Sequence, residues 1–278
     1  MKVNYHTHCN YCDGKGEPRE YVLEAINRSF SSLGFSSHAP LKEENDWTLK
    51  DYDVDNYLLE IKRLKEEFKN SINIYVGLEI DFYPDENRFD YFNKYNLDYS
   101  IGSVHMVKPK GSSVYYSVDE SPEIFESVLT NLFSSSIELF TKEYYTTLRN
   151  MIIQGGFDIL GHFDLIKKFN KGYKYFTEDE PWYREEVFQT LDLLEDTDII
   201  VEMNTGALSR GVQDIPYPSK WILEECYRRN IKVCLNSDVH APNNIECYFN
   251  ESLDILRSCG FKELHTPFEV IDIRRKNG

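Results

Sequence analysis

The residues that could do chemistry begin with two histidines near the N-terminus, His6 and His8, on either side of Thr7. On an extended segment, side chains at i and i+2 point to the same face, and a rise of about 3.3 Å per residue puts their Cα atoms about 6.6 Å apart. Both imidazoles can therefore reach one metal ion, and Asp13 adds a carboxylate just past the segment. A lone pair of this kind is more often a surface or core histidine pair, so the rest of the chain decides the interpretation.

The segments that must position these side chains alternate between helical and strand-like patterns. Apolar residues recur at helical spacing over residues 17–30, 53–70, 122–154, 181–195, 218–229 and 243–259. The strand that carries His6 and His8 is followed by strand-like runs at 34–38, 72–78, 97–104, 157–161, 198–201 and 232–236. This alternation predicts an α/β fold, a distorted seven-stranded (β/α) barrel similar to a TIM barrel, in a single domain over residues 1–278.

One connection is longer than a barrel crossover needs. Residues 108–118 carry Gly111-Ser112-Ser113 between two arms, which predicts a hairpin, and Ser121-Pro122 is a good N-cap and first turn for a helix. Ser134-Ser135-Ser136 predicts a break in that helical region. We interpret residues 107–154 as an insertion that covers the active site, with structural padding as the alternative.

The candidate functional residues share one property, which is that each stands at or just past the C-terminal end of a predicted strand. They are His6, His8, His38, Glu79, His105, His162, Asp238 and His240. In parallel barrels the loops after the strands converge on one face, so these side chains are expected to meet there. His265 is the one histidine that lies elsewhere in the pattern.

Imidazoles mixed with carboxylates are typical ligands of zinc, iron or manganese and are too rich in nitrogen for calcium or magnesium. With Asp13 the set exceeds the needs of one ion, because a zinc site commonly takes three protein ligands and an open position. The sequence therefore predicts two to three divalent transition-metal ions (Zn, Fe or Mn). Closely spaced ions lower the pKa of a shared water, orient a phosphate and neutralise its charge, which favours phosphoester hydrolysis.

The charge balance argues against several partners. Lys and Arg number 31 and Asp and Glu number 47, which gives a net charge of -16. An acidic surface repels phosphate backbones and anionic lipid, so we expect a small-molecule substrate and neither nucleic acid nor membrane as partner. The N-terminus lacks the pattern of a signal peptide, and no apolar run is long enough to span a membrane, which predicts a cytoplasmic protein. The oligomeric state is not defined by these features.

The six cysteines are expected to be reduced. Cys9 and Cys12 match the C-x-x-C spacing, but no second pair completes a structural zinc site.

The motifs around the strand ends resemble those of the polymerase and histidinol phosphatase (PHP) superfamily. These motifs are His6-Thr-His8, Ser-His38-Ala-Pro, Gly-Leu-Glu79-Ile-Asp, Gly-Ser-Val-His105, Leu-Gly-His162-Phe-Asp and Asp238-Val-His240. Further details, Cys12-Asp13-Gly14 and Tyr217-Pro218-Ser219 among them, are similar to the stand-alone histidinol-phosphatases of that superfamily. The resemblance implies a distorted seven-stranded barrel, a trinuclear metal centre, and hydrolysis of L-histidinol phosphate to L-histidinol and phosphate in histidine biosynthesis.

The resemblance also implies how the ligands divide among the ions. The first metal would take His6, His8, Glu79 and Asp238; the second would share Glu79 and add His105 and His162; the third would take Asp13, His38 and His240. Relatives often place a histidine where Asp13 stands, so the affinity and metal preference of the third site are the least defined.

The mechanistic hypothesis is attack on phosphorus by a hydroxide that bridges two ions, with Asp238, His240 or a metal-bound water protonating the leaving group. Arg210 is the candidate phosphate clamp, because a guanidinium offers a planar fork of donors. The candidates for the ammonium and imidazole of the substrate are Glu43, Glu44, Asp164, Tyr116 and Ser117, with Asn204 as a further substrate-binding candidate.

Three alternatives remain. A different PHP-type phosphoesterase could act on a small diester or a nucleotide, whereas an exonuclease would need a basic track that a net charge of -16 does not favour. An amidohydrolase also opens with His-x-His, but Glu79 stands where many of those enzymes use a modified lysine. A non-enzymatic, metal-binding regulatory subunit is expected to have lost ligands, and this chain keeps a ligand-type residue at each motif.

Overall fold

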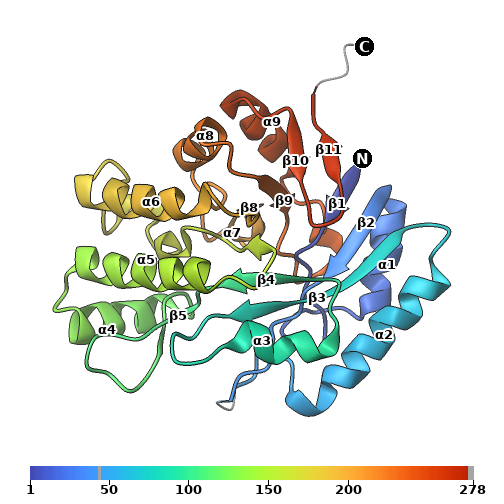
Figure 1. The fold of residues 1–278 in the computed structure, drawn as a ribbon, viewed down its shortest axis with the longest axis horizontal. Coiled ribbons are helices and arrows are strands. Elements are labelled where there is room, and N and C mark those ends of the chain that lie inside the picture. The colour runs from blue at the N-terminus through green and yellow to red at the C-terminus, as the bar shows by residue number, and fades with distance from the viewer. Residues whose placement is uncertain (43–44, 275–278) are drawn as a thin grey trace.

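Seven parallel strands form the centre of the molecule in the computed structural model, which describes residues 1–42 and 45–274 (Figure 1). The strands are β1 (Lys2–Asn4), β2 (Phe30–Phe35), β3 (Asn73–Asp81), β4 (Tyr99–Ser103), β7 (Ile159–Leu160), β8 (Ile200–Asn204) and β9 (Val233–Asn236). They lie side by side in this order, and each neighbouring pair is parallel. The predicted seven-stranded barrel is confirmed.

The barrel closes just past the ends of β1 and β9. Thr7 and Val239 form a parallel bridge, in which His8 N donates to Val239 O at 2.9 Å and Val239 N donates to His6 O at 3.1 Å. The backbone pairing that closes the barrel therefore holds His6 and His8 beside the segment that carries Asp238.

Helices surround the strands (Figure 1). They are α1 (Pro18–Asn27), α2 (Val54–Glu67), α3 (Arg88–Phe92), α4 (Pro122–Leu132), α5 (Ile137–Gln154), α6 (Pro181–Leu194), α7 (Gly206–Ser209), α8 (Lys220–Arg228) and α9 (Phe249–Cys259). Their buried residues recur at helical spacing, as Tyr57, Ile61 and Leu64 do in α2, because one face of each amphipathic helix packs on a strand or on a neighbouring helix. Among the described residues, no helix is both long and apolar enough to cross a membrane.

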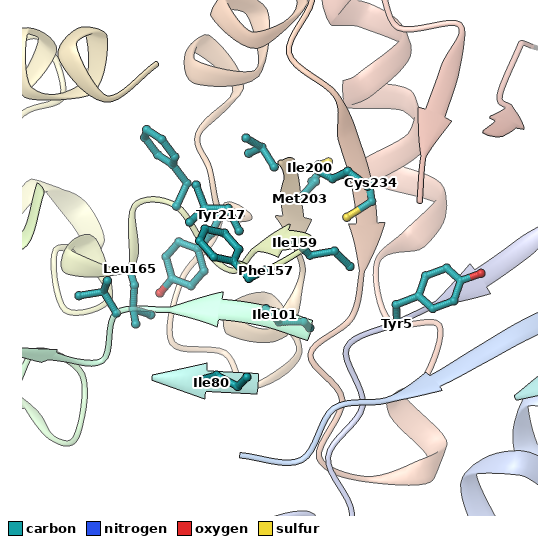
Figure 2. Packing of buried hydrophobic residues seen from close by; sticks show 14 of the residues in the cluster. Tyr5, Ile80, Ile101, Phe157, Ile159, Leu165, Ile200, Met203, Tyr217 and Cys234 are labelled. Atoms are coloured by element: carbon teal, nitrogen blue, oxygen red, sulfur yellow. The ribbon is translucent and has the colours of Figure 1, made fainter. Parts of the chain in front are cut away.

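Apolar side chains from neighbouring strands pack in the interior of the barrel (Figure 2). Ile101 in β4 is in register with Ile159 in β7, and Ile159 is in register with Ile200 in β8. Residues in register on parallel strands point to the same side of the sheet, and Ile101 is also in register with Glu79 of β3. The carboxylate of Glu79 therefore shares its face of the sheet with buried isoleucines, which exclude water from that side.

The predicted hairpin and helix break are confirmed. The hairpin consists of β5 (Met106–Val107) and β6 (Tyr116–Ser117), which are antiparallel with Met106 opposite Ser117. Ser121 Oγ accepts a hydrogen bond from Ile124 N at 3.2 Å at the start of α4. Ser136 caps α5 in the same way, which separates the two helices where the serine run lies.

Two predicted boundaries were wrong. The first helix ends at Asn27, and β2 already begins at Phe30, because Ser29 adopts a left-handed φ of 60° and Phe30 pairs with Lys2 of β1. The last helix begins at Phe249 and not at residue 243, because a 3-10 turn at Pro242–Asn244 and a left-handed Tyr248 precede it.

A C-terminal hairpin, β10 (Glu263–His265) and β11 (Val270–Asp272), was not predicted from the sequence. Its turn packs on the barrel, where Phe268 stacks on Tyr75 with ring centroids 3.7 Å apart. Glu269 accepts hydrogen bonds from Tyr5 Oη at 3.3 Å and from Ser32 Oγ at 3.1 Å. Its three-residue strands are too short to show a period of two in the sequence.

Candidate metal centre

Glu79 lies at the centre of the histidine cluster and is buried, with 1% of its surface exposed. Its Oε1 lies 2.9 Å from His162 Nε2 and 3.6 Å from His105 Nε2. Its Oε2 faces three further imidazole nitrogens, which are His38 Nδ1 at 3.0 Å, His6 Nε2 at 3.2 Å and His8 Nε2 at 3.4 Å. One carboxylate therefore stands between two groups of imidazoles, with one oxygen toward each.

Backbone pairing fixes the relative position of Glu79 and His38. The two residues form a parallel bridge past the end of β2, in which Glu79 N donates to Ser37 O at 3.1 Å and Ala39 N donates to Glu79 O at 2.8 Å. The neighbouring β4 is in register with Glu79 through Ile101, and its chain continues directly into His105.

Asp238 completes the group around His6 and His8. Its Oδ1 lies 3.3 Å from His8 Nε2 and 3.7 Å from His6 Nε2, and its Oδ2 accepts a hydrogen bond from Arg210 Nη2 at 3.0 Å. Asp238 has a left-handed φ of 49°, a strained conformation for a residue with a Cβ. Gly206 is required beside this pair, because a Cβ there would lie 2.5 Å from Asp238 Oδ2.

A third group lies toward the surface. His240 Nε2 lies 3.2 Å from Asp13 Oδ2, and the ring of His240 stacks on that of His8 with centroids 4.2 Å apart. Asp13 Oδ1 lies 3.9 Å from His38 Nε2. The structure thus brings together all nine residues predicted as ligands. Their division among ions stays a prediction.

The donor set fits divalent metal ions. Several buried atoms have no hydrogen-bond partner among the described residues, although they face one another across short distances; they are His6 Nε2, His8 Nε2, His38 Nδ1 and Glu79 Oε2. Buried nitrogen and oxygen atoms left without partners are costly, and a cation bound between them removes that cost. Ligand atoms within 4.8 Å of one another form the groups His8/Asp13/His38/His240, His6/His8/Asp238 and Glu79/His105/His162, with a further group of His38, Asp81 and His105.

Glu202 in β8 forms hydrogen bonds that hold residues of the cluster in place. It is fully buried and accepts hydrogen bonds from His6 Nδ1 at 2.7 Å, His162 N at 3.1 Å, Asn204 Nδ2 at 2.8 Å and Asn236 Nδ2 at 2.9 Å. A carboxylate on Nδ1 fixes the proton of His6 there and leaves Nε2 free to bind a metal. The sequence places Glu202 at a strand end, but its partner His6 is distant in the chain, so this role was missed.

Asp81 has the same relation to His105. Its Oδ1 lies 2.7 Å from His105 Nδ1, which directs Nε2 of that ring toward Glu79. This residue was also missed, although a signal exists in the sequence. Asp81 stands two residues after Glu79 in β3, and side chains at i and i+2 of a strand share a face.

Electrostatics favour the metal-binding protonation states of His8 and Asp238, whereas neighbouring carboxylates outweigh burial and raise the pKa of His6, His38 and His105. Burial, together with His240 and His38, lowers the pKa of His8 to about 3, so its ring is neutral near pH 7. Burial opposes ionisation of Asp238, but Arg210 and His6 outweigh it and hold the pKa of that carboxyl well below its usual range. Neutral imidazoles beside ionised carboxylates are the forms that bind metal. An ionised carboxyl is a poor proton donor, and the acid role of Asp238 stays a prediction.

The residues predicted to bind substrate separate into four sets. Arg210 lies at the cluster, where Nη1 lies 3.2 Å from His240 Nδ1. Tyr116 and Ser117 are half-buried in β6, next to the strand that follows His105. Glu43 and Glu44 lie outside the described residues.

The other two predicted residues, Asp164 and Asn204, form hydrogen bonds or ion pairs with residues inside the protein. Asp164 is fully buried, and its Oδ2 lies 2.6 Å from Lys167 Nζ and accepts from Ser219 N at 3.1 Å. Asn204 is also fully buried, and its amide donates to Glu202 and accepts from Gly206 N at 2.8 Å. Both side chains already have internal partners, so the geometry does not favour direct contact with substrate.

A barrel whose strand ends hold a buried cluster of imidazoles and carboxylates defines a metal-dependent class of protein. The family model for the PHP domain matches residues 4–206. This match covers most of the chain, and the protein belongs to the PHP domain family.

Known proteins align with nearly the full length of this chain. The histidinol-phosphatase of Bacillus subtilis is 28% identical over 263 residues, which cover 88% of this chain and 96% of that protein. A candidate histidinol phosphatase from Listeria monocytogenes has a solved structure with a TM-score of 0.81, 24% identity, and coverage of 90% of this chain and 99% of its own. The structure of the Lactococcus lactis histidinol phosphate phosphatase, complexed with zinc, L-histidinol and phosphate, has a TM-score of 0.72 at 22% identity, over 97% of this chain and 98% of that one. These two structures show that the fold is shared.

Proposed function

We propose that the protein is a metal-dependent phosphomonoesterase that hydrolyses L-histidinol phosphate to L-histidinol and phosphate. The observation that carries the proposal is Glu79, whose two oxygens face separate groups of imidazoles at 2.9 to 3.6 Å. Support for the substrate comes from the Bacillus subtilis relative of that name and from the Lactococcus lactis structure with L-histidinol and phosphate. We also propose that the protein acts in the cytoplasm.

The nine clustered residues would hold two to three divalent ions. His6, His8 and Asp238 would hold one ion together with Glu79 Oε2, and His105 and His162 would hold another at Glu79 Oε1. Asp13, His38 and His240 would hold the third. Such ions supply an activated water near neutral pH and neutralise the charge of a bound phosphate.

The protein's own side chains would orient the substrate. Arg210 donates to Asp238 Oδ2 and lies beside His240, and about a third of its side chain is exposed, so its guanidinium can also donate hydrogen bonds to phosphate oxygens. Three groups could protonate the departing alkoxide: Asp238, His240 and solvent. The low pKa of Asp238 favours His240 and solvent. The β5–β6 hairpin starts directly after His105, which supports our proposal that residues 107–154 cover the site.

The direct test is phosphate release from L-histidinol phosphate beside a panel of other phosphomonoesters, phosphodiesters and nucleotides. Preference for L-histidinol phosphate supports the proposal, whereas preference for a diester or a nucleotide would assign a different PHP-type activity. Arg210→Ala should lower kcat/KM about tenfold or more, on the scale of a charge-assisted hydrogen bond. Arg184→Ala is the matched control, because Arg184 of α6 is similarly exposed but pairs with Asp179, which precedes that helix.

A further inference from the structure

Asp119 stands beside the metal centre without a role in it. It follows β6, whose end is fixed to the histidine cluster by backbone pairing, since Val118 N donates to His105 O at 2.9 Å. The hairpin therefore leaves the barrel at Met106, returns at Ser117, and places Asp119 next to the turn that carries His105.

Two loops meet at this carboxylate, and a third contacts the backbone of the lysine that pairs with it. Asp119 Oδ2 lies 2.9 Å from Lys168 Nζ, on the loop after β7 that also carries His162. Gln213, near Arg210 on the loop after β8, donates to the backbone oxygen of Lys168 at 2.9 Å. The side chain of Asp119 is 20% exposed, so it is held in place and still open to solvent.

One oxygen of Asp119 has capacity left. From the described residues, Oδ1 receives a long contact of 3.4 Å from Ser117 Oγ, in contrast to the short bond at Oδ2. In the part of the chain that the structure describes, the other acidic groups around the cluster each have at least one oxygen 2.6 to 3.9 Å from an imidazole, Arg210 or Lys167, and the unpartnered oxygens of Asp81 and Asp164 are buried; these groups are Asp13, Glu79, Asp81, Asp164, Glu202 and Asp238. Among the described acids that are not proposed metal ligands, Asp119 thus combines proximity, exposure and spare acceptor capacity.

The charge of Asp119 acts on the cluster. Burial disfavours its ionised form, but Lys168 and His105 outweigh this and lower the pKa of Asp119 to about 2, so it is an anion at neutral pH. In turn, Asp119 is among the carboxylates that raise the pKa of His105 and Arg210. The negative charge of Asp119 therefore acts on both His105 and Arg210.

We infer that Asp119 binds the ammonium group of the substrate and thereby selects phosphate esters of amino alcohols. The inference rests on the proposed function. In L-histidinol phosphate the ammonium stands on the carbon next to the ester carbon, so it must lie close to the phosphate. With the phosphate at Arg210 and the cluster, a carboxylate beside His105 meets that ammonium and gives it a charge-assisted hydrogen bond.

The test compares two substrates in two variants. Asp119→Asn keeps the shape of the side chain and removes its charge. Asp85→Asn is the matched control, since Asp85 also pairs with a lysine of this region, Lys108, but is 60% exposed. The substrates are L-histidinol phosphate and the same ester without the amino group.

Asp119→Asn should lower kcat/KM about tenfold to a hundredfold for L-histidinol phosphate, mainly through KM, and leave the deaminated ester nearly unchanged. Asp85→Asn should change neither value. Equal losses on both esters would show that Asp119 only supports the fold of the site, and no loss on either would place the ammonium elsewhere; both results overturn the inference.

Binding of L-histidinol itself separates this inference from the proposed function. Calorimetric titration of the metal-loaded protein should give weaker L-histidinol binding to Asp119→Asn than to the wild type or to Asp85→Asn. Wild-type protein that binds L-histidinol in this Asp119-dependent way but does not hydrolyse the phosphate ester would refute the proposed function alone. Equal binding by all three proteins would refute the inference alone.

Discussion

Replacing Glu202 by glutamine removes a negative charge directly behind the metal centre while it preserves the size of the side chain. In the wild type, the carboxylate accepts from His6 Nδ1 at 2.7 Å and from three further donors on residues 162, 204 and 236. A glutamine has one acceptor oxygen, and its NH2 group would face at least one donor. His6 therefore loses a charge-assisted bond, and a buried donor is left without an acceptor.

Two costs follow from this geometry. Loss of the carboxylate behind a metal-binding imidazole typically lowers metal affinity or activity by about 10- to 100-fold, which is roughly 1.4 to 2.8 kcal/mol. A buried donor without an acceptor costs a further 1–3 kcal/mol or so of folding stability. We expect the first cost to appear in the metal dissociation constant and the second in the free energy of unfolding of the metal-free protein.

The assay is competition with a chelator of known affinity, followed by kcat/KM for phosphate release on the same samples. Glu186→Gln is the matched control, because Glu186 is also buried, at 6% exposed, but pairs with Arg149 at 2.8 Å on the outer helices. That variant should lose stability and keep its metal affinity. If Glu202→Gln binds metal as tightly as the wild type, the assignment of Glu202 as the partner that orients His6 is refuted.

Three further outcomes are expected. Asp13→Ala should lower the metal content measured by elemental analysis and leave the site on His6 and His8 occupied; loss of all metal would contradict separate sites. Phe268→Ala should lower the free energy of unfolding in urea by about 2–4 kcal/mol, because it removes the ring stacked on Tyr75, with kcat unchanged. The ionised Asp119 should stabilise the fold by about 2 kcal/mol above pH 4, since its folded pKa of about 2 lies below the ordinary pKa of 3.8, and this contribution is lost as the pH falls through 2. Acid unfolding of Asp119→Asn should accordingly be less steep than that of the wild type, and an identical acid transition would contradict this assignment.

The barrel and the meeting of the histidines were predictable because both follow from local patterns. Periodicity marks each strand, and the rule that loops after parallel strands converge turns a list of strand ends into one cluster. His38 and Glu79 illustrate this, since one follows β2, the other lies near the end of β3, and neighbouring strands must bring them together.

The supporting residues were not predictable in the same way. Glu202 and His6 meet only because the barrel closes, and nothing near either residue in the sequence indicates the other. Asp164 and Asn204 are the opposite case, because local partners were visible. Lys167 stands three residues after Asp164, and Gly206 stands two residues after Asn204, as in a turn that the asparagine side chain caps.

The measurement that tests the central claim most directly is metal content and phosphate release on one sample, before and after removal of metal and after its return. We predict two to three equivalents of a divalent transition metal per chain, loss of L-histidinol phosphate hydrolysis when they are removed, and recovery when they are restored. Full activity in metal-free protein would contradict the account.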